Sequence, residues 1–222
     1  MSVKVSTLLG SEIKVYHGSD KIIERPLYGT GISTNDYGLG FYMSPFCELA
    51  AEWAVPNENI DGYVNEYVLN ISQLRLLDID MELFECWVSI LVQNRGGSFS
   101  DVVKMRIEKF INLYPFSVKN YDVVKGWRAD DAYFGFVRDF FNAALSLENL
   151  KIAMKFGDLG TQYCLISQKA FDTIKFVSPA KKVLTKDYNP LRKARDDSAR
   201  NAYKSLLNKG RGTLILDIVG RD

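Results

Sequence analysis

Two short stretches decide the fold of this chain: Tyr-His-Gly-Ser at residues 16–19 and Asp-Tyr-Gly-Leu-Gly-Phe-Tyr-Met-Ser at residues 36–44. The first follows an apolar run and contains His17, the single histidine of the sequence. The second passes from glycine-rich turn residues into Gly-Phe-Tyr and then into a helix-forming segment. We predict a strand at each motif. His17 and Tyr42 would then flank a slot with a free backbone edge, suited to a flat ring that carries an amide.

The composition describes a globular protein without an extreme charge. A length of 222 residues fits one domain with an appendage. The 47% hydrophobic and 13% aromatic content suffices for a substantial core. With 28 basic and 27 acidic residues the net charge is +1, which gives no global electrostatic reason to expect nucleic-acid binding.

The cysteine content and the N-terminal sequence indicate in which cellular compartment the protein is expected. The three cysteines lie far apart, there is one histidine, and no Cys-x-x-Cys spacing occurs, so we expect no metal site. An odd number of cysteines fits a reducing compartment better than a disulfide scaffold. The N-terminus lacks the apolar region of a signal peptide, and no run of 18 apolar residues occurs. We therefore expect a cytoplasmic protein without a membrane partner.

Hydrophobic periodicity predicts alternating strands and helices along the first 178 residues. The expected strands are 13–16, 41–44, 63–70, 74–78, 121–125, 163–167 and 174–177. The expected helices are 45–54, 81–93, 102–114, 132–145 and 146–156, with Ser146 as the N-cap of the last. Residues 21–35 and 126–131 are predicted loops.

The composition changes after residue 178 and becomes rich in lysine and arginine. We predict a domain over 1–178 and a basic helical C-terminal extension over 179–222. A solvated helix is expected over 196–208, ended by Gly210, followed by an edge strand over 213–219. The basic run is a solvated helix face or, as the alternative, a contact for a phosphate-rich or acidic partner.

The His-Gly-Ser strand and the Gly-x-Gly-Phe-Tyr strand that leads into a helix resemble the NAD-binding core of the ADP-ribosyltransferase superfamily. The resemblance is to the branch of the poly(ADP-ribose) polymerases and diphtheria toxin. That branch carries a late strand with a glutamate, which corresponds here to residues 161–167, where Gln162 replaces the glutamate. The chain is also similar to an uncharacterised bacterial domain family with glutamine at this place and an Asp-x-Val-x-Gly-x-x-Ala-Asp-Asp block, found here at 122–131.

This resemblance spans residues 13–178 and implies an α+β fold: a split, mostly antiparallel sheet with helices inserted over 81–156. It implies NAD as the substrate and no metal. His17 would donate a hydrogen bond to a ribose hydroxyl of NAD, and Tyr42 would stack on the nicotinamide. Gly18 would pair through its backbone with the carboxamide, so that a side chain there would obstruct the ligand. The implied NAD-binding set is His17, Gly18, Ser19, Gly40, Phe41, Tyr42, Ser44 and Trp53.

Gln162 bears on the mechanism. An amide keeps a hydrogen bond to the ribose 2′-hydroxyl but supplies neither charge nor a general base. Either the reaction proceeds with less electrostatic stabilisation, or Asp130 or Asp131 supplies the carboxylate. The ordinary role of these two aspartates is to begin the following helix. Arg128 is either a pyrophosphate contact or a surface arginine.

By this resemblance the protein is expected to be a mono-ADP-ribosyltransferase, a bacterial toxin or effector with catalytic residues among His17, Tyr42, Gln162, Asp130 and Asp131. Its partners would be NAD, an acceptor that the sequence does not identify, and a cognate antitoxin. An NAD glycohydrolase and a non-catalytic NAD- or ADP-ribose-binding module are the two alternatives.

Overall fold

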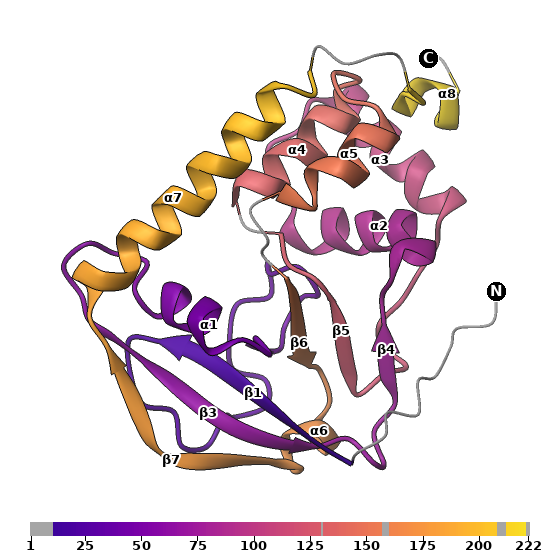
Figure 1. The fold of residues 1–222 in the computed structure, drawn as a ribbon. Coiled ribbons are helices and arrows are strands. Elements are labelled where there is room, and N and C mark those ends of the chain that lie inside the picture. The colour runs from indigo at the N-terminus through magenta and orange to yellow at the C-terminus, as the bar shows by residue number, and fades with distance from the viewer. Residues whose placement is uncertain (1–10, 130, 157–159, 208–211, 221–222) are drawn as a thin grey trace.

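The computed structural model describes residues 11–129, 131–156, 160–207 and 212–220. It confirms an α+β fold whose strands form two sheets (Figure 1). The first sheet has the order β1-β3-β7 and is antiparallel, with β1 (Glu12–Ser19), β3 (Gly62–Asn70) and β7 (Ile174–Val183). The central strand β3 therefore fixes the places of both its neighbours.

The second sheet has the order β2-β6-β5-β4. Its strands are β2 (Phe41–Met43), β6 (Thr161–Leu165), β5 (Val123–Trp127) and β4 (Leu76–Asp78), and β4 and β5 form the parallel pair. Tyr16 and Ser44 exchange both backbone hydrogen bonds at 2.8 Å, and this bridge joins β1 to the residue after β2. The motifs at residues 16–19 and 36–44 thus lie side by side where the sheets meet.

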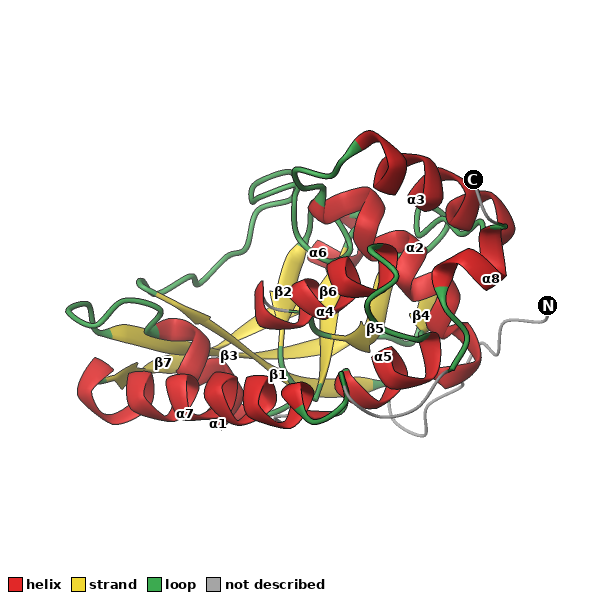
Figure 2. Cartoon of the chain, turned by 90° about the horizontal axis from the view of Figure 1, so that it is seen from above, coloured by secondary structure: helices red, strands yellow, loops and turns green. Residues whose placement is uncertain are grey.

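The helices form two groups (Figures 1 and 2). One group caps the second sheet and holds most of the buried aromatic side chains: η1 (Met81–Leu83), α2 (Phe84–Arg95), α3 (Asp101–Leu113), α4 (Asp131–Phe141) and α5 (Leu147–Ala153). The short helix α6 (Gln168–Phe171) connects β6 to β7. The other group covers one side of the first sheet, where α1 (Cys47–Ala54) packs on β1 and β3 and α7 (Thr185–Lys204) packs on α1. No helix among the described residues is both long enough and apolar enough to cross a membrane.

Two predictions for the C-terminal region need correction or extension. The edge strand over 213–219 is wrong, because α8 (Ile215–Val219) is a short helix whose first turn is capped by the Asp217 carboxylate, which accepts from Leu214 N–H at 3.0 Å. The helix expected over 196–208 begins at Thr185 and continues through Pro190. The predicted end at Gly210 lies outside the described residues.

The expected boundary after residue 178 falls inside β7, which continues to Val183 and pairs there with Gly62 of β3. Helix α7 is tied to α1 by a bidentate ion pair between Arg195 and the buried Glu52, at 2.8 and 2.9 Å. Asn189 donates to the Val55 carbonyl at 3.0 Å. The end of β7 and the start of α7 are therefore continuous with the first sheet and its helical cover.

Candidate functional site

A cavity of about 770 Å³ lies beside the two sequence motifs. Five of the predicted site residues line it: His17, Gly40, Phe41, Tyr42 and Gln162. Much of the remaining wall comes from the loop between β1 and β2, residues 20–40. The cavity is larger than a single ring needs, and its size is that of an ordinary small-molecule or cofactor site.

The loop over 20–40 is held at its base by Asn65, which is fully buried on β3 at the bulge between Val64 and Glu66. Asn65 accepts from Ile23 N–H at 2.9 Å and donates to the carbonyls of Lys21 and His17 at 3.2 and 3.3 Å. These bonds satisfy a polar side chain that would be costly to bury alone. They fix the loop relative to His17.

The packing of α1 on β1 requires the glycine at position 18. A Cβ atom at this position would lie 1.9 Å from the carbonyl oxygen of Ala50, so the glycine lets α1 pack on β1. Its backbone groups point to the same edge of β1 as those of Tyr16, because strand residues two apart share an edge. Gly18 does not line the cavity.

Ser19, Ser44 and Trp53 also do not line the cavity. The Ser19 hydroxyl closes a local turn with Lys21, and the buried Ser44 hydroxyl accepts from Phe46 N–H at 3.0 Å. The ring of Trp53 is covered by the Arg128 guanidinium, 4.0 Å from its centroid. Trp53 therefore supports Arg128, which does line the cavity, instead of forming its wall.

His17 is held in one tautomer. Its Nδ1 lies 2.7 Å from the Tyr42 carbonyl oxygen, which only accepts, so Nδ1 carries the proton. Burial lowers the pKa of His17, which favours the neutral ring, although the bond to Tyr42 acts in the opposite direction. In the neutral ring Nε2 is an acceptor. His17 is thus set to accept a hydrogen bond from a ligand hydroxyl, whereas the sequence analysis expected it to donate one.

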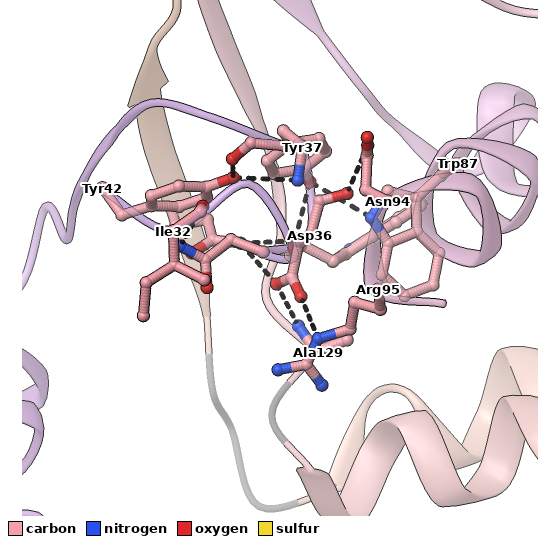
Figure 3. Close-up of polar contacts among 12 residues, drawn as sticks. Ile32, Asp36, Tyr37, Tyr42, Trp87, Asn94, Arg95 and Ala129 are labelled. Carbon is pink, nitrogen blue, oxygen red and sulfur yellow. Dashed lines mark hydrogen bonds and ion pairs between the residues drawn. The ribbon is translucent and has the colours of Figure 1, made fainter. Parts of the chain in front are cut away.

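Tyr42 lines the cavity, and its hydroxyl is bonded within the protein. The hydroxyl donates to the Gly38 carbonyl at 2.6 Å and accepts from Tyr37 N–H at 3.0 Å (Figure 3). Burial raises the pKa of this hydroxyl far above its ordinary value, so it stays protonated. Tyr42 therefore fixes the turn at residues 36–38 in addition to offering a face for stacking.

That turn carries the most unusual group of the site, the carboxylate of Asp36, which is 5% exposed and lines the cavity. Gln162, itself 3% exposed, donates from Nε2 to Asp36 Oδ2 at 2.7 Å and to the Trp127 carbonyl at 3.2 Å. Ala129 N–H donates to the same carboxylate oxygen at 2.8 Å, and Arg95 Nε lies 3.1 Å from Oδ1 (Figure 3). All three groups are donors, as an ionised carboxylate requires.

Burial raises the pKa of Asp36, and the Arg95 charge and the hydrogen bonds from Ala129 and Gln162 oppose that rise. The net direction is upward. A buried carboxylate of raised pKa beside a cavity is the arrangement in which active sites hold catalytic acids, bases and charges.

The structure thus places a carboxylate against Gln162, and it belongs to Asp36. Asp130 lies outside the described residues, and Asp131 is the first residue of α4, with a side chain that is not described. Sequence reasoning missed Asp36 although it lies within the quoted motif. A polar residue just before Tyr-Gly-x-Gly reads as an ordinary turn former. Its buried environment becomes visible only through the contact with Gln162, 126 positions away.

The cavity is strongly basic. Its charged lining residues are Asp36 and five cations: Lys21, Arg25, Arg95, Arg128 and Arg192. This local excess contrasts with the net charge of +1 for the whole chain. No cluster of three or more histidine, cysteine, aspartate or glutamate side chains that would suit a metal ion occurs within the described ranges.

Fold and site together define an α+β protein with a basic cavity between its two sheets, containing one buried carboxylate. The chain belongs to the family described as "Protein of unknown function (DUF3990)", whose model matches residues 13–176. No curated protein and no solved structure gives a significant match. The family match covers β1 from Ile13, all of β3, the first three residues of β7, both sequence motifs, Asp36 and Gln162.

Proposed function

We propose that the protein is an NAD-dependent mono-ADP-ribosyltransferase that cleaves the bond between nicotinamide and ribose and transfers ADP-ribose to an acceptor. The observation that carries the proposal is the cavity in which His17, Tyr42 and Gln162 meet the carboxylate of Asp36. The resemblance of the motifs supplies the reaction. The cavity supplies the chemical groups that the reaction needs, including a carboxylate that the motif comparison alone leaves unassigned.

The reaction begins with NAD in the cavity, its nicotinamide against the Tyr42 ring and a ribose hydroxyl directed at His17 Nε2. The bond from the ribose anomeric carbon to the nicotinamide nitrogen breaks, and its electron pair leaves with neutral nicotinamide. Positive charge develops on the ribose. A nucleophilic atom of the acceptor then bonds to the anomeric carbon and loses its proton, giving ADP-ribosylated acceptor, nicotinamide and one proton.

Asp36 is the group suited to stabilise that positive charge. Three donors already orient its carboxylate, so little reorganisation accompanies the reaction, and burial strengthens its interaction with a nearby cation. Gln162 would act as the positioning residue that holds Asp36. In this proposal Asp36 and Gln162 together take the place of the single glutamate in the family that the motifs resemble.

One observation favours a second candidate, a non-catalytic NAD- or ADP-ribose-binding module. The amide nitrogen of Gln162 already donates hydrogen bonds to Asp36 and to the Trp127 carbonyl. Arg95 already neutralises part of the Asp36 charge. A ligand-binding module would retain the cavity and its cations without needing a free carboxylate. The two candidates agree on NAD binding and differ in nicotinamide release.

The proposal extends to a toxin or effector role in the cytoplasm, with a cognate antitoxin as partner, and rests there on the resemblance of the motifs alone. The decisive experiment incubates the protein with NAD labelled in the adenylate half, in buffer and with a cell lysate. Nicotinamide release together with label on macromolecules supports the transferase. Release without labelled macromolecules indicates a glycohydrolase, and tight NAD binding without release indicates the binding module.

A further inference from the structure

The cations of the cavity fall into two groups that differ in what they contact. The inner group consists of Arg95, at the Asp36 carboxylate, and Arg128, over the Trp53 ring. The outer group consists of Lys21, Arg25 and Arg192. Lys21 and Arg25 are exposed, and neither forms an ion pair with any residue in the described part of the chain. The outer charges are therefore available to a ligand.

Two distant segments meet at this outer end because they leave the same end of the first sheet. Tyr63 of β3 pairs with Ser19 on one side and with Lys182 on the other. The loop that carries Lys21 and Arg25 follows Ser19, and α7, which carries Arg192, follows β7. The register of β3 thus brings the loop over 20–40 and α7 to one cavity.

Arg192 is held in place by the protein. Its guanidinium donates to the Pro56 carbonyl at 3.2 Å. One turn further along, Arg195 is fixed by its bidentate pair with Glu52, and one turn earlier Asn189 is fixed by the Val55 carbonyl. A guanidinium with one donor committed to a carbonyl keeps other donors for a ligand. Helix α7 lies beyond residues 13–176, the range that the family model matches.

We propose that Lys21, Arg25 and Arg192 form a phosphate-binding subsite at the outer end of the cavity, with α7 as an essential wall. The ligand class is an organic phosphate or pyrophosphate, since arginine binds phosphate through charge-assisted hydrogen bonds. That the bound group is the pyrophosphate of NAD rests on the proposed function. The same subsite could instead bind a phosphate of an acceptor that contains phosphodiester bonds.

The test measures binding of ADP-ribose, nicotinamide riboside and a short single-stranded oligonucleotide by calorimetry. Arg192→Gln removes one charge at the subsite. Lys193→Gln is the matched control, because it removes the same charge from the next residue, which pairs with Glu58 and does not line the cavity. We expect Arg192→Gln to weaken ADP-ribose binding about tenfold, the typical effect of one lost charge-assisted hydrogen bond. Lys193→Gln should bind ADP-ribose like the parent, and neither change should alter the binding of nicotinamide riboside, which has no phosphate.

The subsite is overturned if Arg192→Gln binds both ADP-ribose and the oligonucleotide as tightly as the parent does. It is also overturned if the parent binds neither ligand. Loss of oligonucleotide binding with unchanged ADP-ribose binding supports the subsite and assigns it to the acceptor. The proposed function fails separately: ADP-ribose that binds as expected while NAD is never cleaved leaves the subsite standing. An unfolded Arg192→Gln variant is recognised by its melting temperature, and Arg25→Gln on the exposed loop then gives the same comparison.

Discussion

The two ends of the cavity are built in opposite ways. At the inner end, Asp36, Gln162 and Arg95 are buried or largely buried, and their polar groups contact one another over 2.7–3.1 Å. At the outer end, Lys21 and Arg25 are exposed and have no partner ion among the described residues. The difference separates two tasks. A buried, oriented charge acts on a reaction centre, whereas exposed cations attract and hold an anionic ligand. Changes at the inner end should therefore affect the rate of nicotinamide release, and changes at the outer end should affect affinity.

The largest effect is expected for Asp36→Asn. This variant removes the charge and turns an amide N–H₂ toward groups that are all donors, Gln162, Ala129 and Arg95. We expect nicotinamide release at saturating NAD to fall by about 100–1000-fold, the size of effect seen when one preorganised electrostatic group is lost. Release is measured by chromatography. Asp20→Asn, an exposed aspartate of the same loop, is the control and should keep the parental rate.

The mispaired amide in Asp36→Asn should also lower the free energy of unfolding by about 1–3 kcal/mol, because a buried donor is left without an acceptor. Thermal melts monitor this loss. A fully folded Asp36→Asn variant that releases nicotinamide at the parental rate contradicts the assignment of Asp36.

The next largest effect on nicotinamide release is expected for Gln162→Glu. This variant puts a second carboxylate at the 2.7 Å contact with Asp36, so one of the pair must bind a proton. Under the proposed mechanism the ionised Asp36 is the active form of the parent, so we expect the rate to be lost as the pH falls through its raised pKa. The new carboxylate raises that pKa further. We expect about 10–100-fold slower release at neutral pH and an acid limb displaced to higher pH. A pH–rate profile that coincides with that of the parent counts against the pairing.

The sequence predicts the local elements of the fold but not the long-range contacts on which these expected effects depend. The strands at the two motifs, the helix after Tyr42 and the Ser146 N-cap follow from local patterns, and the structure confirms them. Gly18 is also needed for the close approach of the Ala50 carbonyl on α1, which no local pattern reveals.

Asp36 and Arg192 could not be assigned from the sequence because their roles arise from long-range pairing. Asp36 acquires its environment from Gln162 on β6, Arg95 on α2 and Ala129 after β5. Arg192 reaches the cavity through the register of β3. The sequence wrongly predicts a strand at α8 because its four apolar residues around Asp217 are too few for periodicity to distinguish a helix from a strand.

A smaller effect is expected for Tyr42→Phe. The ring that faces the cavity remains, but the hydroxyl bonds to Gly38 and Tyr37 are lost, and with them part of the support for the Asp36 turn. Nicotinamide release should fall about tenfold, with a KM for NAD close to the parental value. Tyr28→Phe, at an exposed position of the loop over 20–40, serves as the control. A raised KM with unchanged release at saturation would place the hydroxyl at the ligand instead.

The smallest effect is expected for Arg25→Gln at the outer end. An exposed cation contributes modestly in water, so the Kd for NAD should rise about three- to fivefold, with nicotinamide release at saturating NAD unchanged. The difference from the parent should shrink in 1 M salt, where exposed charges are screened over about 3 Å. Binding titrations at low and high salt measure this change. If Arg25→Gln changed the rate of nicotinamide release at saturating NAD, the assignment of affinity to the outer end and of rate to the inner end would be wrong.

We propose that the buried carboxylate at the inner end acts in NAD cleavage. This role is tested most directly by nicotinamide release from NAD, with the parent and Asp36→Asn at saturating NAD and equal amounts of folded protein. We expect release by the parent and about 100–1000-fold less by the variant, with ADP-ribose binding retained by both. Absence of release by a parent that binds NAD, in buffer and with acceptor lysate, or equal release by the two proteins, would contradict it.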